Sequence, residues 1–282
     1  TSDLSRIEVQ KSLGSLMQGP NNMGGSINLV SRKPDKAFQG SSTIGFETGK
    51  DGIFSKFGNV QIGSRINDRF YMVAGVSKIN NEDFPLSDDF EPAVNQYTNT
   101  VVQSKGNRFN SANESQTVNL KVGYTPNETD EYVVGYHQIT GEKQATLYAG
   151  GELTGTSTRP AYWDWPQWDK NSLYFLSHTQ MGNTYLKTRA YYDEFKNALN
   201  SYDDDTYSSV TKGYAFRSEY DDHGMGGSIE LGHQFEKHLL KTSLHVKYDE
   251  HKEHDLSKDN AVLDESWRTY QNQIFSFGAE DT

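Results

Sequence analysis

Aromatic side chains concentrate in one short segment, residues 162 to 168, which contains three of the four tryptophans of the chain. Rigid aromatic rings give a large contact area at a small entropic cost, so this segment could bind a planar or hydrophobic ligand. Alternatively, the rings could anchor the chain at an interface between water and an apolar phase. The anchor is the preferred interpretation for Trp165 and Trp168, which lie nearest the following periodic segment. Both interpretations stay open for Tyr162 and Trp163.

Two other clusters could bind a cation. Asp203, Asp204 and Asp205 form an acidic run, and bunched carboxylates suit a hard cation such as Ca²⁺. A solvated charge run is preferred here, because one cluster supplies too few fixed oxygen ligands. His251 and His254 are three residues apart, a spacing that would suit a metal ion on a helix. No helix is indicated there and no further ligand is evident, so a solvated loop is preferred and no metal site is predicted.

The common signatures of catalysis are absent from the sequence. The chain contains no Cys, and it has no nucleophile elbow, phosphate-binding loop or dinucleotide fingerprint. We therefore predict no catalytic residues, no cofactor and no enzymatic activity. The net charge of −11 argues against nucleic acid as a partner, because no basic face could neutralise the phosphates.

The segments that would position these residues alternate in polarity with a period of two, which is typical of β-strands with two different faces. Clear examples run from Val118 to Tyr124 and from Leu240 to Tyr248. We predict that one face of a single curved sheet carries the apolar side chains and the opposite face carries the polar ones. The apolar set is Val118, Leu120, Val122, Leu240, Leu244 and Val246, and the polar set is Asn119, Lys121, Lys241, His245 and Lys247.

The connections between these segments alternate in length. Short turns are expected at 66–68, 126–128, 181–183 and 235–237, and long polar segments at 80–115, 141–169, 196–223 and 251–266. Only the first connection at the end of the long segments, around residues 48–52, is brief. A transmembrane β-barrel has short turns at one end and long loops at the other, whereas a soluble sandwich has no reason to lengthen every second connection. A mean hydropathy of −0.80, without any apolar run of about 18 residues, excludes a helical membrane protein. We therefore predict an all-β, antiparallel transmembrane barrel with about ten strands in this chain, each of roughly 9–11 residues.

The N-terminal segment carries the most specific pattern. Ile7-Glu8-Val9-Gln10 is followed by Ser15-Leu16-Met17-Gln18-Gly19-Pro20 and then by the glycine-led apolar run from Met23 to Pro34. This order resembles the end of the plug domain in TonB-dependent outer-membrane receptors, although Gln18 stands where that family usually has an aromatic residue. The resemblance implies that residues 1–34 are the C-terminal end of a plug. It also implies that residues 37–282 are the N-terminal part of a barrel of about 22 strands.

A turn is expected at Gly19-Pro20-Asn21-Asn22, and residues 19–30 are expected to lie inside the barrel wall. Because the chain begins at Thr1 without a signal peptide, we expect it to be an internal piece of a longer protein.

The resemblance also implies a function, namely active uptake of a scarce nutrient across the outer membrane of a Gram-negative bacterium. TonB would supply the energy through a part of the protein outside this chain, and outer-membrane lipid would surround the barrel. The tryptophan-rich segment and Tyr191-Tyr192-Asp193 look like the siderophore-type members, so a ferric siderophore is the first choice of ligand. Cobalamin, haem or carbohydrate stays open, as does a non-transporting surface protein such as an adhesin. The expected ligand-binding residues are Tyr162, Trp163 and Trp165.

Overall fold

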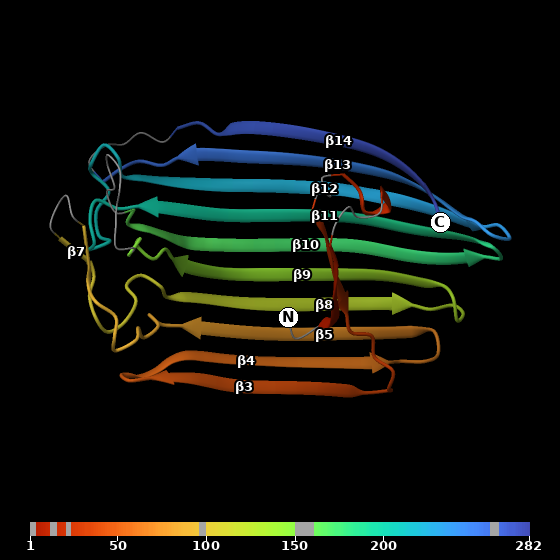
Figure 1. The fold of residues 1–282 in the computed structure, drawn as a ribbon, viewed down its shortest axis with the longest axis horizontal. Helices are drawn as coiled ribbons and strands as arrows, with labels where there is room; N and C mark the ends of the chain where they lie inside the picture. Colours follow the sequence, from red (N-terminus) through yellow and green to blue (C-terminus); the bar gives the residue numbers. More distant parts are fainter. Residues whose placement is uncertain (1–3, 12–15, 21–23, 96–99, 150–160, 260–264) are drawn as a thin grey trace.

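The structure is a computed structural model that describes residues 4–11, 16–20, 24–95, 100–149, 161–259 and 265–282. One antiparallel sheet dominates it, in which ten strands follow one another in the order β3-β4-β5-β8-β9-β10-β11-β12-β13-β14 (Figure 1). The strand bounds are β3 Gln39–Gly49, β4 Gly52–Arg65, β5 Phe70–Asn81, β8 Asn113–Tyr124, β9 Glu131–Gln144, β10 Trp163–Met181, β11 Thr184–Ser201, β12 Phe216–Gln234, β13 Leu239–Asp255 and β14 Arg268–Asp281.

Two small hairpins accompany this sheet. Strands β1 (Leu4–Lys11) and β2 (Gly25–Ser31) pair near the N-terminus, with the 3-10 turn η1 (Leu16–Gln18) between them. Strands β6 (Ala93–Asn95) and β7 (Thr100–Gln103) pair within the long connection from β5 to β8. Within the described residues, no helix has the length and the apolar character that crossing a membrane requires.

One face of the large sheet, the outer face, is apolar and exposed. Met72 pairs with Val122, and Val122 pairs in turn with Val134, so apolar side chains stand side by side on successive strands. The exposed fraction is 50% for Val122 and 71% for Phe275 at the far end of the sheet. So large an exposed apolar surface is unusual for a soluble protein. The prediction is confirmed for the apolar set, since Leu120, Leu240, Leu244 and Val246 are exposed as well and Val118 pairs with the exposed Val76.

The opposite face, the inner face, lies against the N-terminal hairpin. The Nζ atom of Lys121 donates hydrogen bonds to the Ser31 hydroxyl, at 2.8 Å, and to the carbonyl of Arg32. His245 lies beside Gly19, whose φ of +93° places it in the region that favours glycine. These contacts confirm that Lys121 and His245 point inward, and Lys247 lines the cavity between the hairpin and the sheet.

The same hairpin runs across the strands of the sheet (Figure 1). Ile27, near the middle of β2, lines the cavity on the inner face, as the sequence predicts for residues 19–30. Asn21 and Asn22 of the expected turn lie outside the described residues. After β2 the chain approaches the sheet closely, because Pro34 is buried and a Cβ added to Gly63 would come within 3.1 Å of the Pro34 ring.

Short turns and long loops alternate along the chain as predicted. The four predicted short turns lie at one end of the sheet and the long connections at the other, where the β3–β4 connection, residues 50–51, is short as well (Figure 1). The predicted strand length is wrong, however, because the strands contain 11 to 19 residues. β10 and β12 begin, and β11 and β13 end, inside the segments that the sequence assigns to loops. Polar residues are frequent in these extensions, and the β10 extension contains a bulge, so a regular alternation of apolar residues does not detect them.

Candidate ligand-binding site

The tryptophan-rich segment forms the first part of β10, and a bulge there controls where its rings point. From Asp164 to Gln167 is a step of three residues on β10, whereas the paired step on β11, from Asn200 to Ala198, is two. The extra residue interrupts the ladder at Pro166, which has no N–H to donate. Beyond the bulge the alternation of faces is inverted. Trp163 and Trp165, at odd positions, therefore face the same side as Trp168, at an even position.

That side is the inner face. Trp165 pairs with Lys143, which follows inner-face positions on β9, and Trp168 pairs with Asn197 and lines the inner cavity. The Lys143 ammonium lies 4.6 Å from the ring centre of Trp165 and 3.3 Å from that of Trp168. The anchor interpretation of Trp165 and Trp168 is therefore wrong. Trp168 shares the inner face with Lys170 by regular alternation, and the bulge turns Trp165 to the same face.

Edge-to-face contacts join these rings into one group, the aromatic cluster, with ring centres 4.9 to 6.3 Å apart. Trp165 lies 6.3 Å from Trp163 and 6.0 Å from Trp168, and such geometry adds to the gain from burying the rings. The members on the sheet are Trp163, Trp165, Trp168, Phe195 and Phe216.

Three tyrosines from the loops form a second group beside the start of β10. Tyr162 meets Tyr207 edge to face at 5.8 Å, and Tyr207 meets Tyr202 at 5.5 Å. The Tyr202 hydroxyl donates to Asp164 at 2.9 Å. The hydroxyl of Tyr207 is buried and has no hydrogen-bond partner among the described residues. A buried donor without a partner is costly, and a bound ligand could accept its hydrogen bond.

The phenols of this group stay protonated. Burial, followed by the nearby charge of Asp205, raises the pKa of Tyr162 above its ordinary value of 10.0. Burial also raises the pKa of Tyr207. Both hydroxyls are therefore neutral donors at physiological pH. The sequence places Tyr207 only in an acidic loop, and no local pattern indicates its contact with Tyr162.

Asp203 organises the loop that carries Tyr207. Its side chain is buried rather than solvated, which corrects the sequence interpretation for this residue. The carboxylate accepts hydrogen bonds from the Thr211 hydroxyl at 2.6 Å, the Lys212 amide at 2.8 Å and the Ser209 hydroxyl at 2.9 Å. Burial opposes the charge, yet these hydrogen bonds together hold the pKa of Asp203 well below its ordinary value of 3.8. Its oxygens therefore already have partners within the loop.

A large cavity adjoins the aromatic cluster, between the inner face and the N-terminal hairpin. Its volume is about 1340 Å³, large enough for a sizeable small-molecule ligand. Trp168 and Phe195 contribute to one wall, and Glu8, Gln10 and Asn28 of the hairpin contribute to the opposite one.

Acidic side chains outnumber basic ones around this cavity. Its basic lining residues are Lys170, Arg189 and Lys247, and its acidic ones are Glu8, Asp193, Asp222 and Asp249; Glu250 also borders it but lies on the outer face with Tyr248. Some of these charges are paired, as in the contact of 2.8 Å between Lys247 and Asp249. The surplus of carboxylates favours cationic or neutral ligands over polyanions.

His251 belongs to the same wall rather than to a loop, which corrects the second sequence interpretation. It lies within β13, where its Nδ1 atom is 2.6 Å from Asp222 and its ring stacks between Tyr220 and Tyr270. His254 occupies the opposite face of β13 and stacks on Trp267 at 3.8 Å. The two histidines therefore point away from each other and cannot bind one metal ion.

Comparison with known proteins identifies the architecture. No protein-family model matches the sequence, and no curated protein matches it significantly. Solved structures do match over 99% of the chain. They include the copper transporter OprC (TM-score 0.72, 14% identity), and the ferripyoverdine receptor of the Pseudomonas aeruginosa outer membrane (0.66, 11%). A mutant of the ferric enterobactin receptor PfeA from the same organism also matches (0.67, 10%).

The chain spans 40%, 39% and 42% of the length of these three proteins, respectively. Agreement over nearly the whole chain at such low identity shows a shared fold. The chain thus has the fold of the TonB-dependent outer-membrane receptors, an antiparallel β-barrel, of which the described residues form ten consecutive strands.

Proposed function

We propose that this chain is part of a Gram-negative outer-membrane receptor that takes up a scarce nutrient actively, with a ferric siderophore as its ligand. In this proposal residues 1–34 end the plug domain and residues 37–282 begin the barrel. TonB would drive uptake through a part of the protein outside this chain. The observation that carries the proposal is the aromatic cluster on the inner face, at the loop end of the sheet and beside a cavity that the hairpin lines.

Tyr162, Trp163 and Trp165 are the proposed ligand contacts. Each is half-buried, so each ring is held in place by its neighbours while part of its surface stays accessible. The unpartnered hydroxyl of Tyr207 adds a hydrogen-bond donor next to Tyr162. Rigid rings with a few well-placed polar groups are typical of small-molecule sites.

The charges of the cavity favour one kind of siderophore. Because carboxylates outnumber cationic side chains there, a polyanionic ferric chelate would meet like charges. We therefore propose that neutral or cationic ferric chelates bind more tightly than polyanionic ones.

Growth on single nutrient sources would test this function. A strain that lacks the receptor would be complemented with the full-length gene and supplied with one ferric chelate, haem, cobalamin or a carbohydrate at a time. The proposal expects growth to be restored by at least one ferric chelate, and to be lost again when TonB is deleted. Growth restored only by cobalamin, haem or carbohydrate would refute the siderophore, and restoration independent of TonB would refute active uptake.

A further inference from the structure

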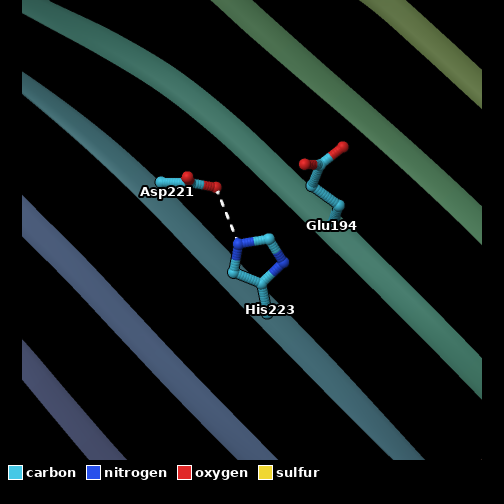
Figure 2. A group of neighbouring side chains, drawn as sticks. All are labelled: Glu194, Asp221 and His223. Atoms are coloured by element: carbon cyan, nitrogen blue, oxygen red, sulfur yellow. Dashed lines mark ion pairs between the residues drawn. The ribbon is translucent and has the colours of Figure 1, made fainter.

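Three metal-ligand side chains meet on the outer face of the sheet, and of these residues only His223 also borders the cavity described above. Glu194 lies on β11, and Asp221 and His223 lie two residues apart on β12. Glu194 and His223 are direct partners across the two strands. One ligand atom from each of the three side chains lies within 4.8 Å of the other two. Figure 2 shows the His223 ring turned toward Asp221, with Glu194 rising from the neighbouring strand.

The histidine is already oriented for this role. Its Nδ1 atom is hydrogen-bonded to the Tyr192 hydroxyl at 2.8 Å, and its Nε2 atom lies 3.1 Å from Oδ1 of Asp221. A metal-binding histidine commonly uses one ring nitrogen for the metal and the other for a hydrogen bond that fixes its tautomer. If Nδ1 donates to Tyr192, the lone pair of Nε2 faces the two carboxylates.

Asp221 supplies a second observation. Its Oδ1 atom is fully buried and accepts no hydrogen bond from any described residue, although it points at the Nε2 atom of His223. Buried carboxylate oxygens normally have a donor or a cation beside them. An ion between Asp221 and His223 would satisfy this oxygen.

Lys196 lies next to the three ligands, and its ammonium would compete with a metal ion for them. Its ammonium lies 2.7 Å from Glu194, and its position pairs with Asp221 across the strands. An ammonium can balance the negative charge of the cluster, but it provides no ligand for a metal ion. A bound metal ion would therefore have to displace Lys196 from Glu194, and removal of this lysine should strengthen metal binding.

The location and the ligand types define the ion. Tyr136, Tyr192 and Tyr248 lie in one row of paired residues across the outer face. Glu194 and His223 form the next outer-face pair, two residues closer to the long loops on each strand. The cluster thus lies just beyond a belt of tyrosines, which typically marks the membrane interface. One imidazole nitrogen and two carboxylate oxygens suit a borderline divalent transition metal such as Zn²⁺, whereas Ca²⁺ and Mg²⁺ prefer oxygen ligands alone.

We propose that Glu194, Asp221 and His223 bind a divalent transition-metal ion on the outer face of the barrel, with Tyr192 positioning His223 and Lys196 occupying the site in the absence of metal. Water would complete the coordination on the exposed side. The site lies on the outer face, whereas the proposed ligand contacts lie at the aromatic cluster, so it stands whether or not the receptor takes up a siderophore.

The test uses the full-length protein, purified in detergent and stripped of metal with a chelator. Zn²⁺ affinity is measured by competition with a chromophoric chelator, and Cu²⁺ is used as an electron paramagnetic resonance probe of nitrogen coordination. We expect His223→Gln and Asp221→Asn to weaken Zn²⁺ binding at least tenfold, and Tyr192→Phe to weaken it about tenfold. Lys196→Met should tighten binding several-fold.

The matched control is His233→Ala, on the same strand and the same face. His233 is hydrogen-bonded to the Thr184 hydroxyl at 2.7 Å rather than to carboxylates, and its removal should leave the affinity unchanged. The nitrogen signal of Cu²⁺ should disappear in His223→Gln and persist in His233→Ala. Zn²⁺ binding and a Cu²⁺ nitrogen signal that both survive His223→Gln, or wild-type protein that binds neither ion, would overturn the proposal. Asp221→Asn is nearly isosteric, so loss of folding does not confuse its result.

Discussion

Trp165 and Trp168 lie edge to face on the inner side of the sheet, with their ring centres 6.0 Å apart, although they are three positions apart on one strand. In a regular strand such residues would point to opposite faces. The one-residue bulge at Pro166 makes their contact possible, and Lys143 lies against both rings. The aromatic cluster therefore depends on the number of residues between the tryptophans as well as on the presence of the tryptophans.

Deletion of Pro166 tests this relationship. Without the extra residue, Trp163 and Trp165 should turn to the face opposite that of Trp168, and affinity for the ferric chelate should fall at least tenfold. Tryptophan quenching by brominated lipid should increase at the same time, because two rings would move to the outer face. The control Pro166→Ala keeps the residue count and should bind as the wild type does. Equal quenching in the deletion variant and the wild type would contradict the role of the bulge.

The assignment of the outer face to lipid predicts the cost of a charge there. Leu120→Arg should destabilise the folded protein in a bilayer by about 2–4 kcal/mol, since arginine is costly near the bilayer midplane. Thr117→Arg, on the inner face of the same strand, should cost about 1 kcal/mol or less because the cavity is hydrated. Reversible unfolding by denaturant in lipid vesicles would measure both. A larger cost at Thr117 than at Leu120 would show that the two faces are assigned the wrong way round.

The hairpin is held to the wall by a small set of polar contacts, of which those of Lys121 are the most central. Lys121→Met removes its hydrogen bonds to Ser31 and Arg32, each worth about 1.5–3 kcal/mol when the donor is charged. We expect amide hydrogen exchange at residues 30–33 to accelerate by roughly tenfold or more, a change of at least about 1.4 kcal/mol. Lys78→Met, which breaks an ion pair with Glu114 on the outer face, should leave that exchange unchanged. Unaltered exchange in Lys121→Met would mean that other contacts hold the hairpin.

The loop after β11 should resist acid. The pKa of Asp203 is depressed in the folded protein, so its stabilising effect is complete above its ordinary pKa of 3.8 and is lost only as the pH falls through the lower folded value. Limited proteolysis of this loop should therefore be as slow at pH 4 as at pH 7. Asp203→Asn should be cleaved much faster at both pH values, whereas Asp205→Asn, which alters an exposed carboxylate, should behave as the wild type does. Rapid cleavage of the wild type at pH 4 would contradict this account.

Much of the architecture could be predicted from the sequence because period-two alternation and the lengths of connections depend on local pattern alone. The inward orientation of Lys121 and the outward orientation of Leu244 follow directly from alternation. Prediction failed where register matters. The bulge at Pro166 inverts the faces before it, so Trp165 points inward beside Trp168 instead of lying at the membrane interface. Nothing in the local pattern of β10 reveals which residue is extra.

The partnerships between distant segments were also beyond prediction. Tyr207 meets Tyr162 from a loop 45 positions further along the chain, and Glu194 meets His223 only because β11 and β12 pair in that register. His251 was assigned to a loop because polar residues continue β13 past the apolar stretch. Such contacts are consequences of strand pairing. A local pattern in the sequence describes each of the two contacting segments separately and does not indicate that they pair.

The most direct test of the aromatic cluster as the ligand site is the affinity of the full-length receptor for ferric chelates after replacement of Tyr162, Trp163 and Trp165 by alanine, one at a time. Trp267→Ala is the control, since Trp267 stacks on His254 at the outer face and is the fourth tryptophan of the chain. We expect at least one of the three replacements to weaken binding tenfold or more, because aromatic anchors dominate binding energy, and Trp267→Ala to leave it unchanged. Wild-type affinity in all three variants would contradict the account.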